Sequence, residues 1–336
     1  MSAARDDAGD VAALLGLVRG YVVTQSLHAA ALLGVADHLA DGPRNADELA
    51  ARTGSDASAL HRLLRALASV DVVRRTDPDT FALGPLGYLL RSNVEGSLRS
   101  WVLLNGGTLY QAFADIAHTL RSGRPATEAV FDTDLFGHLE ESPEEAALFE
   151  SAMGEISRRW GQAAVAVCDV SWARHIVDVG GGSGEFLTAL LRAHPGARGT
   201  LFDRPHVLAR ARTGFDLASR CEFVAGDFFE SVPAGGDVYL LSWILHDWDD
   251  ASAMRILRNV RGAIVPDGRL LVVESVLPPG DTPHFSRFGD VVMLVALGGR
   301  ERTEAEYADL LDRAGFRLRR VLPTGGPRSV IEAQPC

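Results

Sequence analysis

One histidine lies where a parallel sheet would place a reactive group. His246 follows the strand-like run 239–245, and ligands and catalytic groups in such sheets lie beyond the carboxyl ends of the strands. An imidazole exchanges a proton near neutral pH. A lone histidine is more often structural, so its position is what favours a general base. Asp249 or Asp250 is interpreted as the cap of the next helix rather than a metal ligand, and no metal site is predicted.

A glycine-rich turn with an acid before it is the second feature. The sequence VDVGGGSG occupies residues 177–184 and a helical pattern follows. Gly180 and Gly182 permit unusual φ values and close approach of a ligand, but the G-x-G-x-G spacing departs from the dinucleotide pattern. Asp178 would oppose a pyrophosphate and attract a cation. The turn alone is weak evidence, and it favours a cofactor with a cationic amino acid end.

Two further acids end the next strand-like runs. Asp203 comes 23 residues after Gly180, the offset expected of an acid that binds ribose hydroxyls. Asp227 ends the third run, where a carboxylate can accept from an adenine amino group while Phe228 packs on the ring. Each acid alone is as readily a turn residue. Three acids at successive strand ends indicate a nucleoside cofactor.

The elements that must position these side chains alternate in type. Helical patterns cover 185–193, 206–211, 251–264 and 304–314, and strand-like runs cover 175–179, 199–202, 221–225, 238–243, 269–276 and 329–333. Such alternation is typical of a largely parallel sheet with helices on both faces. We therefore predict an α/β fold with a Rossmann-like, doubly wound sheet in residues 171–336.

The N-terminal part has the outline of a winged helix. Asn45 and Glu48 form a capping-box pattern, the helix they begin ends at Gly54, and two short β-like runs follow around residues 77–79. Winged helices often bind DNA, but residues 1–90 hold eight arginines against eleven acidic residues, so pairing fits better. We expect residues 1–95 to form a mostly helical dimerisation domain. The aromatic-rich, mostly helical residues 96–170, including 101–120 and 143–167, would contribute to a substrate pocket.

Composition excludes several classes of protein. All 33 basic residues among the 336 are arginine, and P-loop ATPases, protein kinases and pyridoxal enzymes each need a lysine. The net charge of −11 argues against a nucleic-acid partner. The three cysteines are far apart and predict no disulfide framework. Neither a secretion signal nor a membrane-length apolar run is evident, so we expect a cytoplasmic protein with no membrane partner.

Six blocks of the sequence together resemble one enzyme family. VDVGGGSG, LFDRPHVL, GDFF, LLSWILHDWDD, VVESVLP and GGRERTEAEY are similar to the S-adenosylmethionine-dependent O-methyltransferases typified by plant caffeate and flavonoid enzymes. They are more similar still to bacterial relatives that act on polyketides and other aromatic natural products. The resemblance covers nearly the whole chain, and HDW followed by GGRERT is its most specific part. It implies S-adenosylmethionine as cofactor, a small aromatic acceptor and a homodimer.

The same resemblance implies roles for individual residues. The methionine part of the cofactor would lie at Gly180 and its neighbours, the ribose at Asp203 and the adenine at Asp227 and Phe228. His246 would be the general base that takes the proton of a phenol. Further residues matching the family are Glu274 and Glu301 as acids that orient the base, Ser242 and Trp243 near the cofactor, and Asp290, Met293 and Trp248 at the acceptor pocket. Plant enzymes have a lysine at the position of Ser242, which puts one detail of cofactor binding in doubt.

Three other functions remain open at the level of sequence. The same scaffold can methylate nitrogen, where no strong base is required. The cofactor can be bound while the chemistry has changed to hydroxylation or decarboxylation, since fold does not fix function. A winged-helix regulator that senses S-adenosylmethionine would be a third possibility, disfavoured by the acidic N-terminal part and the full set of His and Glu residues.

Overall fold

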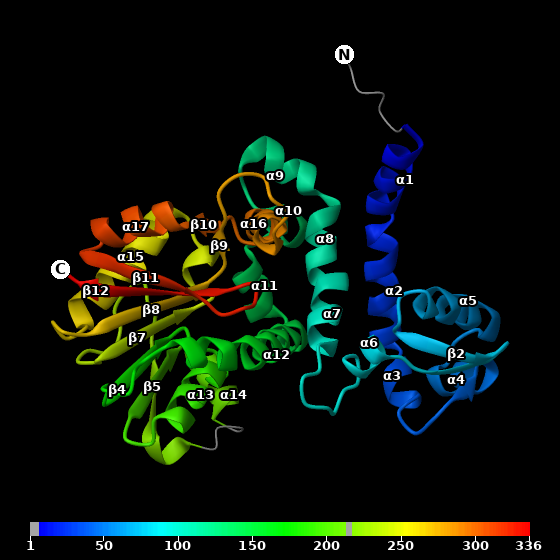
Figure 1. The fold of residues 1–336 in the computed structure, drawn as a ribbon, viewed down its shortest axis with the longest axis horizontal. Coiled ribbons are helices and arrows are strands. Elements are labelled where there is room, and N and C mark those ends of the chain that lie inside the picture. Colours follow the sequence, from blue (N-terminus) through cyan, green and yellow to red (C-terminus); the bar gives the residue numbers. More distant parts are fainter. Residues whose placement is uncertain (1–6, 213–216) are drawn as a thin grey trace. The chain divides into compact units, whose positions relative to one another are not determined.

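Two units divide the chain, residues 1–110 and 111–336, and Figure 1 shows their elements in chain order. The structure, a computed structural model, describes residues 7–212 and 217–336. None of the helices in these residues combines the length and the apolar character needed to cross a membrane.

The first unit has the predicted winged-helix outline. The side chain of Asn45 accepts from the backbone N–H of Glu48, whose side chain accepts in return, and Gly54 ends this helix at φ 67°. A three-stranded antiparallel sheet in the order β1-β3-β2 completes the unit. Its elements are α1 (Asp7–Val18), α2 (Gly20–Leu32), α3 (Val35–His38), β1 (Arg44–Asn45), α4 (Ala46–Thr53), α5 (Ala57–Ala68), β2 (Val73–Asp77), β3 (Thr80–Leu83), α6 (Pro85–Tyr88) and α7 (Arg99–Gly106).

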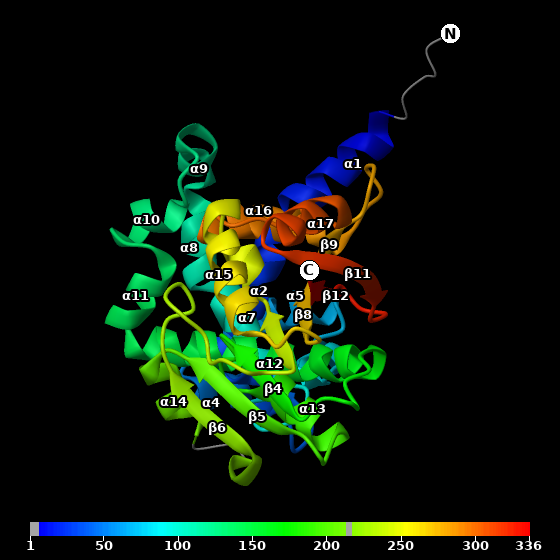
Figure 2. The ribbon, with the colours of Figure 1, turned by 90° about the vertical axis from the view of Figure 1, so that its left-hand side faces the viewer.

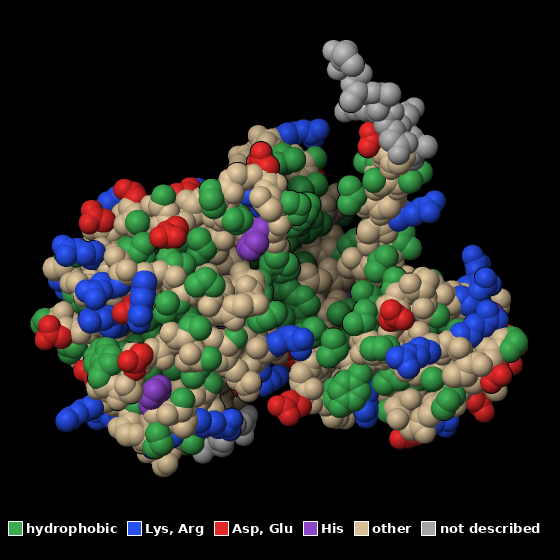
Figure 3. All heavy atoms as spheres, viewed as in Figure 1, with side chains coloured by type: hydrophobic (Ala, Val, Ile, Leu, Met, Phe, Trp, Pro, Cys, Tyr) green, Lys and Arg blue, Asp and Glu red, His purple; other side chains and the backbone are tan. Residues whose placement is uncertain are grey.

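Apolar side chains are left exposed along α1 and the start of α2. Leu17 is 79% exposed and Leu14 63%, and Figure 3 shows apolar side chains along this helical segment. The others in this set are Val11, Leu15, Val18, Tyr21, Val22 and Val23. A contiguous apolar surface of this kind marks an interaction site.

Helices also make up the first third of the second unit. The continuous helix expected over 101–120 is instead interrupted at Gly107, with φ −102° and ψ −104°, and again at Asp115. The long helix predicted over 143–167 is present with those bounds. The elements here are α8 (Thr108–Ala114), α9 (Ile116–Ser122), α10 (Ala126–Phe131), α11 (Leu135–Glu141) and α12 (Pro143–Val167).

A seven-stranded sheet organises the rest, in the order β11-β12-β8-β7-β4-β5-β6. The five neighbouring strands β8, β7, β4, β5 and β6 are parallel to one another. β12 runs antiparallel to both of its neighbours, β8 and β11. The strands are β4 (His175–Val179), β5 (Arg198–Asp203), β6 (Cys221–Ala225), β7 (Val238–Ser242), β8 (Arg269–Glu274), β11 (Phe316–Pro323) and β12 (Ser329–Pro335). The short strands β9 (Val276–Leu277) and β10 (Arg302–Thr303) pair separately.

Helices cover both faces of this sheet (Figure 2). One apolar core joins the sheet to α15 and α17, and another joins it to α12, α13 and α14. The helices are α13 (Glu185–Ala193), α14 (Pro205–Ala211), α15 (Asp250–Ala263), α16 (Phe285–Ala296) and α17 (Glu304–Arg313). The predicted doubly wound fold is confirmed. Strand order reverses between β4 and β7, which is where such sheets bind ligands.

One strand was not predicted, and the bounds of β5, β7, β8 and β12 differ from the predicted ones by one or two residues. β11 was not expected, because only Phe316 of its eight residues is buried and an exposed edge strand lacks an apolar run. β7 ends one residue early, since Trp243 adopts φ 59°. A left-handed conformation is unusual for a bulky residue and often marks a functional segment.

Candidate active site

The glycine turn after β4 leaves room for a ligand at the backbone. Gly180 and Gly182 have φ of 68° and 56°, values that L side chains rarely adopt. At Gly181 a Cβ atom would lie 2.6 Å from the carboxylate of Asp178. The turn therefore presents bare backbone beside an acid, as the sequence suggested.

Asp178 is a buried carboxylate with a free acceptor. The residue is 1% exposed, and its Oδ1 atom has no hydrogen-bond partner among the described residues. Burial and, to a smaller extent, the charge of Asp203 together raise the pKa of Asp178 to about 7. An unpaired buried acceptor is costly, and a ligand ammonium group would satisfy it. This site therefore fits a cofactor with a cationic amino acid end.

The acids at the ends of β5 and β6 are held by backbone N–H groups. Asp203 accepts from Gly182 at 2.8 Å through Oδ2 and from Arg204 at 2.7 Å through Oδ1, and burial raises its pKa. Asp227 accepts from the N–H of Phe229 at 2.8 Å. The two carboxylates are thereby fixed at the same edge of the sheet as the glycine turn.

Trp248 lies in an aromatic cluster next to Phe228. Its ring centroid is 4.7 Å from that of Phe229, 6.1 Å from Phe228 and 5.8 Å from Phe136 of α11. Trp248 therefore packs beside Phe228, the residue expected at the adenine, and its place at the acceptor pocket stays a prediction.

His246 is clamped between two carboxylates. Its Nδ1 lies 3.1 Å from Oε1 of Glu301 and its Nε2 lies 3.3 Å from Oδ1 of Asp247, and the side chain is 4% exposed. Burial lowers the pKa of His246, but Asp247, Glu301 and Glu274 outweigh burial and raise it to about 9. Burial raises the pKa of Asp247 to about 7, opposed by the imidazole. The ring can gain and lose a proton without leaving its partners.

Glu274 holds the backbone around His246 rather than the imidazole. Its Oε1 accepts from the N–H groups of Ile244 at 3.2 Å, Leu245 at 2.6 Å and His246 at 3.3 Å, while Oε2 accepts from the hydroxyl of Tyr307. Glu274 is fully buried. It caps the short 3₁₀ turn that carries His246. Of the two acids predicted to orient the base, Glu301 therefore contacts the imidazole and Glu274 contacts the backbone.

The loop after α16 packs directly on the base. A Cβ atom at Gly299 would lie 2.0 Å from the carbonyl oxygen of His246, and the N–H of Arg300 donates to that oxygen at 2.8 Å. The N–H of Glu301 donates to Asp290 at 2.8 Å. Asp290 therefore positions Glu301, and its place at the acceptor pocket, implied by the resemblance, stays a prediction. Met293, also on α16, is half-buried.

Arg302 fastens this loop to the segment after His246. Its guanidinium donates to the carbonyls of Leu245 at 2.9 Å and Trp248 at 3.0 Å, and to Asp250 at 3.0 and 2.8 Å. The residue is 1% exposed. As predicted for one of the two acids, Asp249 caps α15 by accepting from Ser252.

Trp243 lies beside the base. Its ring centroid is 5.4 Å from that of His246, and the guanidinium carbon of Arg328 lies 3.4 Å from the centre of the Trp243 ring. Ser242, the last residue of β7, is half-buried and in register with Val273 of β8. Trp243 thus belongs to the group around His246, and the position near the cofactor that the resemblance implies stays a prediction.

Four residues of this site were not found from the sequence, namely Asp247, Arg302, Tyr307 and Arg328. Asp247 adjoins His246 in the chain, and that adjacency was an available signal. Arg302 lies in β10, Tyr307 in α17 and Arg328 in the β11–β12 hairpin. These elements are far from His246 in the chain, and only the folded arrangement brings them to the site. No group of three or more His, Cys, Asp or Glu side chains in residues 7–212 and 217–336 is arranged to hold a metal ion.

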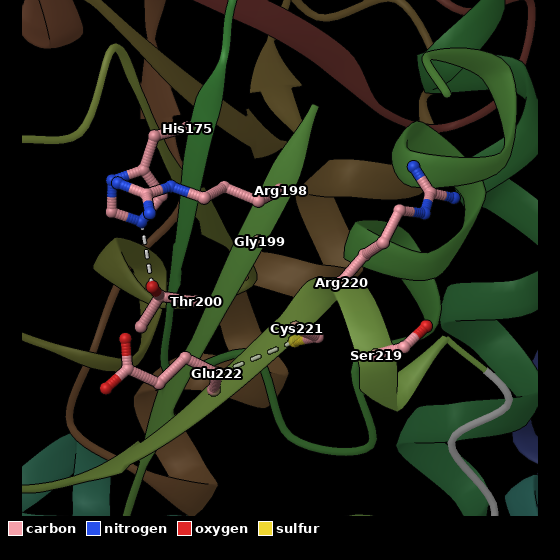
Figure 4. A pocket seen from close by; sticks show the side chains of 8 residues that line it. All are labelled: His175, Arg198, Gly199, Thr200, Ser219, Arg220, Cys221 and Glu222. Atoms are coloured by element: carbon pink, nitrogen blue, oxygen red, sulfur yellow. Dashed lines mark hydrogen bonds between the residues drawn. The ribbon is translucent and has the colours of Figure 1, made fainter. Parts of the chain in front are cut away.

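A cavity of about 440 Å³ lies elsewhere, at the amino ends of β4, β5 and β6. Figure 4 shows the hydrogen bond between His175 and Thr200, in which the two side chains are 2.8 Å apart. His246 and the glycine turn occupy the opposite, carboxyl ends of the strands. This cavity therefore contributes nothing to the site.

Comparison with known proteins identifies both units. Residues 15–93 match the O-methyltransferase dimerisation domain and residues 113–317 match the O-methyltransferase domain. Phenazine O-methyltransferase PhzM of Lysobacter antibioticus is 45% identical over 96% of this chain and 95% of that protein. The 3-amino-4-hydroxybenzoate 4-O-methyltransferase of Streptomyces cremeus is 44% identical over 94% of this chain and 87% of its own length.

Solved structures agree with these matches. An O-methyltransferase from neocarzinostatin biosynthesis, NcsB1, in complex with S-adenosylmethionine and 2-hydroxy-5-methyl naphthoic acid, superposes with a TM-score of 0.80 at 35% identity, over 94% of this chain and 96% of that chain. Some relatives that cover about nine-tenths of this chain are N-methyltransferases.

Proposed function

Because this chain belongs to the O-methyltransferase family and uses S-adenosylmethionine, we propose that it transfers a methyl group to a hydroxyl oxygen of a small aromatic acceptor, with His246 as general base. The observation that carries the proposal is His246 held between Glu301 and Asp247. The relatives named as acting on phenazine and aminohydroxybenzoate support an aromatic acceptor from natural-product biosynthesis.

The residues at the glycine turn are proposed to hold the methyl donor. Bound S-adenosylmethionine supplies a methyl group on a positively charged sulfur. Asp178 would pair with its ammonium group, Asp203 would accept from ribose hydroxyls, and Asp227 would accept from the adenine amino group beside Phe228. Asp203 keeps lone pairs for this because it uses one acceptor contact per oxygen for the backbone.

His246 is proposed to remove the proton of the acceptor hydroxyl. A phenol has a pKa near 10, like that of tyrosine, so it is mostly protonated at neutral pH and needs a base as its oxygen attacks. Glu301 and Asp247 would stabilise the imidazolium that forms. Glu274, Asp290 and Arg302 act indirectly, by fixing the backbone that carries the base and its partner.

Methyl transfer is tested with isotopically labelled S-adenosylmethionine and a panel of phenols, phenolic acids, hydroxyphenazines and aromatic amines. We expect a labelled phenol ether, identified by mass spectrometry. Label on nitrogen would favour the N-methyltransferase alternative, and tight cofactor binding without any labelled product would contradict the proposal.

The separate regions are proposed to divide the work. Residues 1–95 would pair two chains, residues 96–170 would help to line the acceptor pocket, and residues 171–336 would bind the cofactor and carry the base.

Cofactor binding is expected to depend on the ionisation of Asp178. Its pKa is raised to about 7, and only the carboxylate attracts an ammonium group, so affinity for S-adenosylmethionine should rise with pH up to about 7 and then level off. Asp178→Asn should weaken binding about 10- to 100-fold and remove this rise. Titration calorimetry from pH 5.5 to 8.5 measures both, with exposed Asp169→Asn as the control. Unchanged affinity in Asp178→Asn would contradict the assignment.

Pairing of two chains is expected to use the apolar surface of α1. The double variant Leu14→Glu, Leu17→Glu places charges on side chains that are 63% and 79% exposed in one chain, so it should leave that chain folded and halve the mass measured by light scattering. The matched control is Leu120→Glu, which changes a leucine 70% exposed on α9. A wild-type mass equal to one chain would rule out the homodimer.

A further inference from the structure

Arg328 is a buried cation near His246, and the proposed mechanism does not use it. The residue is 3% exposed, its guanidinium stacks on Trp243 at 3.4 Å, and Trp243 in turn lies 5.4 Å from the His246 ring. The Nε and Nη2 atoms of Arg328 have no hydrogen-bond partner among the described residues. Burying a charged donor without a partner is costly.

The backbone fixes where this guanidinium lies. The hairpin between β11 and β12 closes with Thr324, whose hydroxyl donates to the carbonyl of Arg328 at 2.7 Å. The next residue, Ser329, is in register with Glu274 at the carboxyl end of β8. Arg328 is therefore held at the sheet edge that carries His246.

The nearby glutamates do not use the free donors. Glu274 and Glu301 stabilise the positive charge of Arg328, although burial holds its pKa well below the usual value. Both oxygens of Glu274 are occupied by backbone N–H groups and Tyr307, and Oε1 of Glu301 faces His246. Oε2 of Glu301 is, like Nε and Nη2 of Arg328, a buried atom without a hydrogen-bond partner among the described residues. The two residues are therefore near one another without a direct bond, and no ion pair of Arg328 is found in the described part of the chain. The two glutamates thus stabilise the charge of Arg328 without a hydrogen bond, and the Nε and Nη2 donors remain available to a ligand.

We propose that Arg328, stacked on Trp243, is a subsite for the carboxylate of the acceptor, so that the chain prefers aromatic hydroxy acids over phenols without an acid group. A guanidinium offers planar, paired donors that match a carboxylate. An aromatic acid bound there would lie with its ring near Trp243 and within reach of His246. The inference rests on the proposed function, because it assumes that the acceptor binds beside the base.

The test measures binding to the enzyme saturated with S-adenosylhomocysteine, so that turnover is not required. The probes are two pairs that differ by the carboxylate: 3-amino-4-hydroxybenzoate with 2-aminophenol, and 1-hydroxy-2-naphthoate with 1-naphthol. We expect the wild-type enzyme to bind at least one acid about 10- to 100-fold more tightly than its partner, as for a charge-assisted hydrogen bond. Equal binding within both pairs, or no binding of either acid, would overturn the proposal.

Variants of Arg328 distinguish a carboxylate subsite from a purely structural role of its charge. Arg328→Met should remove the preference for acids and leave binding of the uncharged partners and of S-adenosylhomocysteine unchanged, while Arg328→Lys should retain part of it. Arg320→Met, on the same hairpin but 51% exposed and paired with Glu332, should retain all of it. An equal loss for acids and uncharged partners would show a structural role, and a loss confined to S-adenosylhomocysteine would assign Arg328 to the cofactor. Either result overturns the acceptor subsite.

The enzyme could form labelled methyl ethers from uncharged phenols and show no preference for acids. That result would support the proposed methyl transfer and exclude the carboxylate subsite. If Arg328→Met does not fold, the preference of the wild type and the response of Arg328→Lys still decide the question.

Discussion

Replacing His246 with alanine is expected to lower kcat for methyl transfer about 10²- to 10⁴-fold, the usual contribution of a positioned general base. The side chain is buried between Glu301 and Asp247, and no other described imidazole lies in this cluster. Affinity for S-adenosylmethionine should stay within a few-fold of wild type, because the glycine turn and its acids are untouched. Single-turnover rates with labelled cofactor give the effect on chemistry, with His61→Ala, on α5 of the other unit, as the control.

The pH dependence of kcat/KM should show the direction expected for a general base. A base works in its unprotonated form, and the pKa of His246 is raised to about 9, so kcat/KM should rise with pH up to about 9. Asp247 contributes to that raised pKa, and Asp247→Asn should therefore move the rising limb to lower pH. In His246→Ala the rate should instead follow ionisation of the phenol itself, whose pKa lies near 10, from a much lower level at neutral pH. Near-normal turnover by His246→Ala at neutral pH would refute the base.

Replacing Arg302 with methionine is expected to lower the free energy of unfolding by about 3–5 kcal/mol. Arg302 is 1% exposed, and its loss leaves the carbonyls of Leu245 and Trp248 without their donor. For a chain of this size the midpoint of thermal unfolding should fall by about 4–7 °C. Denaturant titration measures the energy directly.

Arg300→Met is the matched control for Arg302. Its side chain is 45% exposed and pairs with Asp250 and Glu306 at the surface, where an ion pair contributes about 0–1 kcal/mol. A loss below about 1 kcal/mol in Arg302→Met, equal to that in Arg300→Met, would show that the loop is held by other contacts.

Local signals predicted most of the fold. Apolar runs marked the buried strands, and caps such as Asn45 and Asp249 marked helix starts, because both depend on residues close in the chain. β11 escaped notice because an exposed edge strand buries only Phe316. The interruption at Gly107 also escaped notice, since the apolar spacing on both sides is helical.

The candidate site was predicted less completely. His246 and the acids at successive strand ends follow from their positions relative to strands, which the sequence shows. The tasks of Glu274 and Asp290 do not, because each carboxylate accepts from backbone N–H groups that only the folded loops bring near. Arg328 reaches Trp243 through the antiparallel pairing of β12 with β8, which no local pattern indicates.

The close approach of Gly299 to His246 has a consequence for protein engineering. A side chain at Gly299 would overlap the backbone carbonyl of His246, and Asp290 fixes Glu301. The segments 285–303 and 244–250 therefore depend on each other and must be exchanged together. Chimeras that exchange acceptor preference between relatives should therefore place their crossovers outside both segments and inherit them from the same parent.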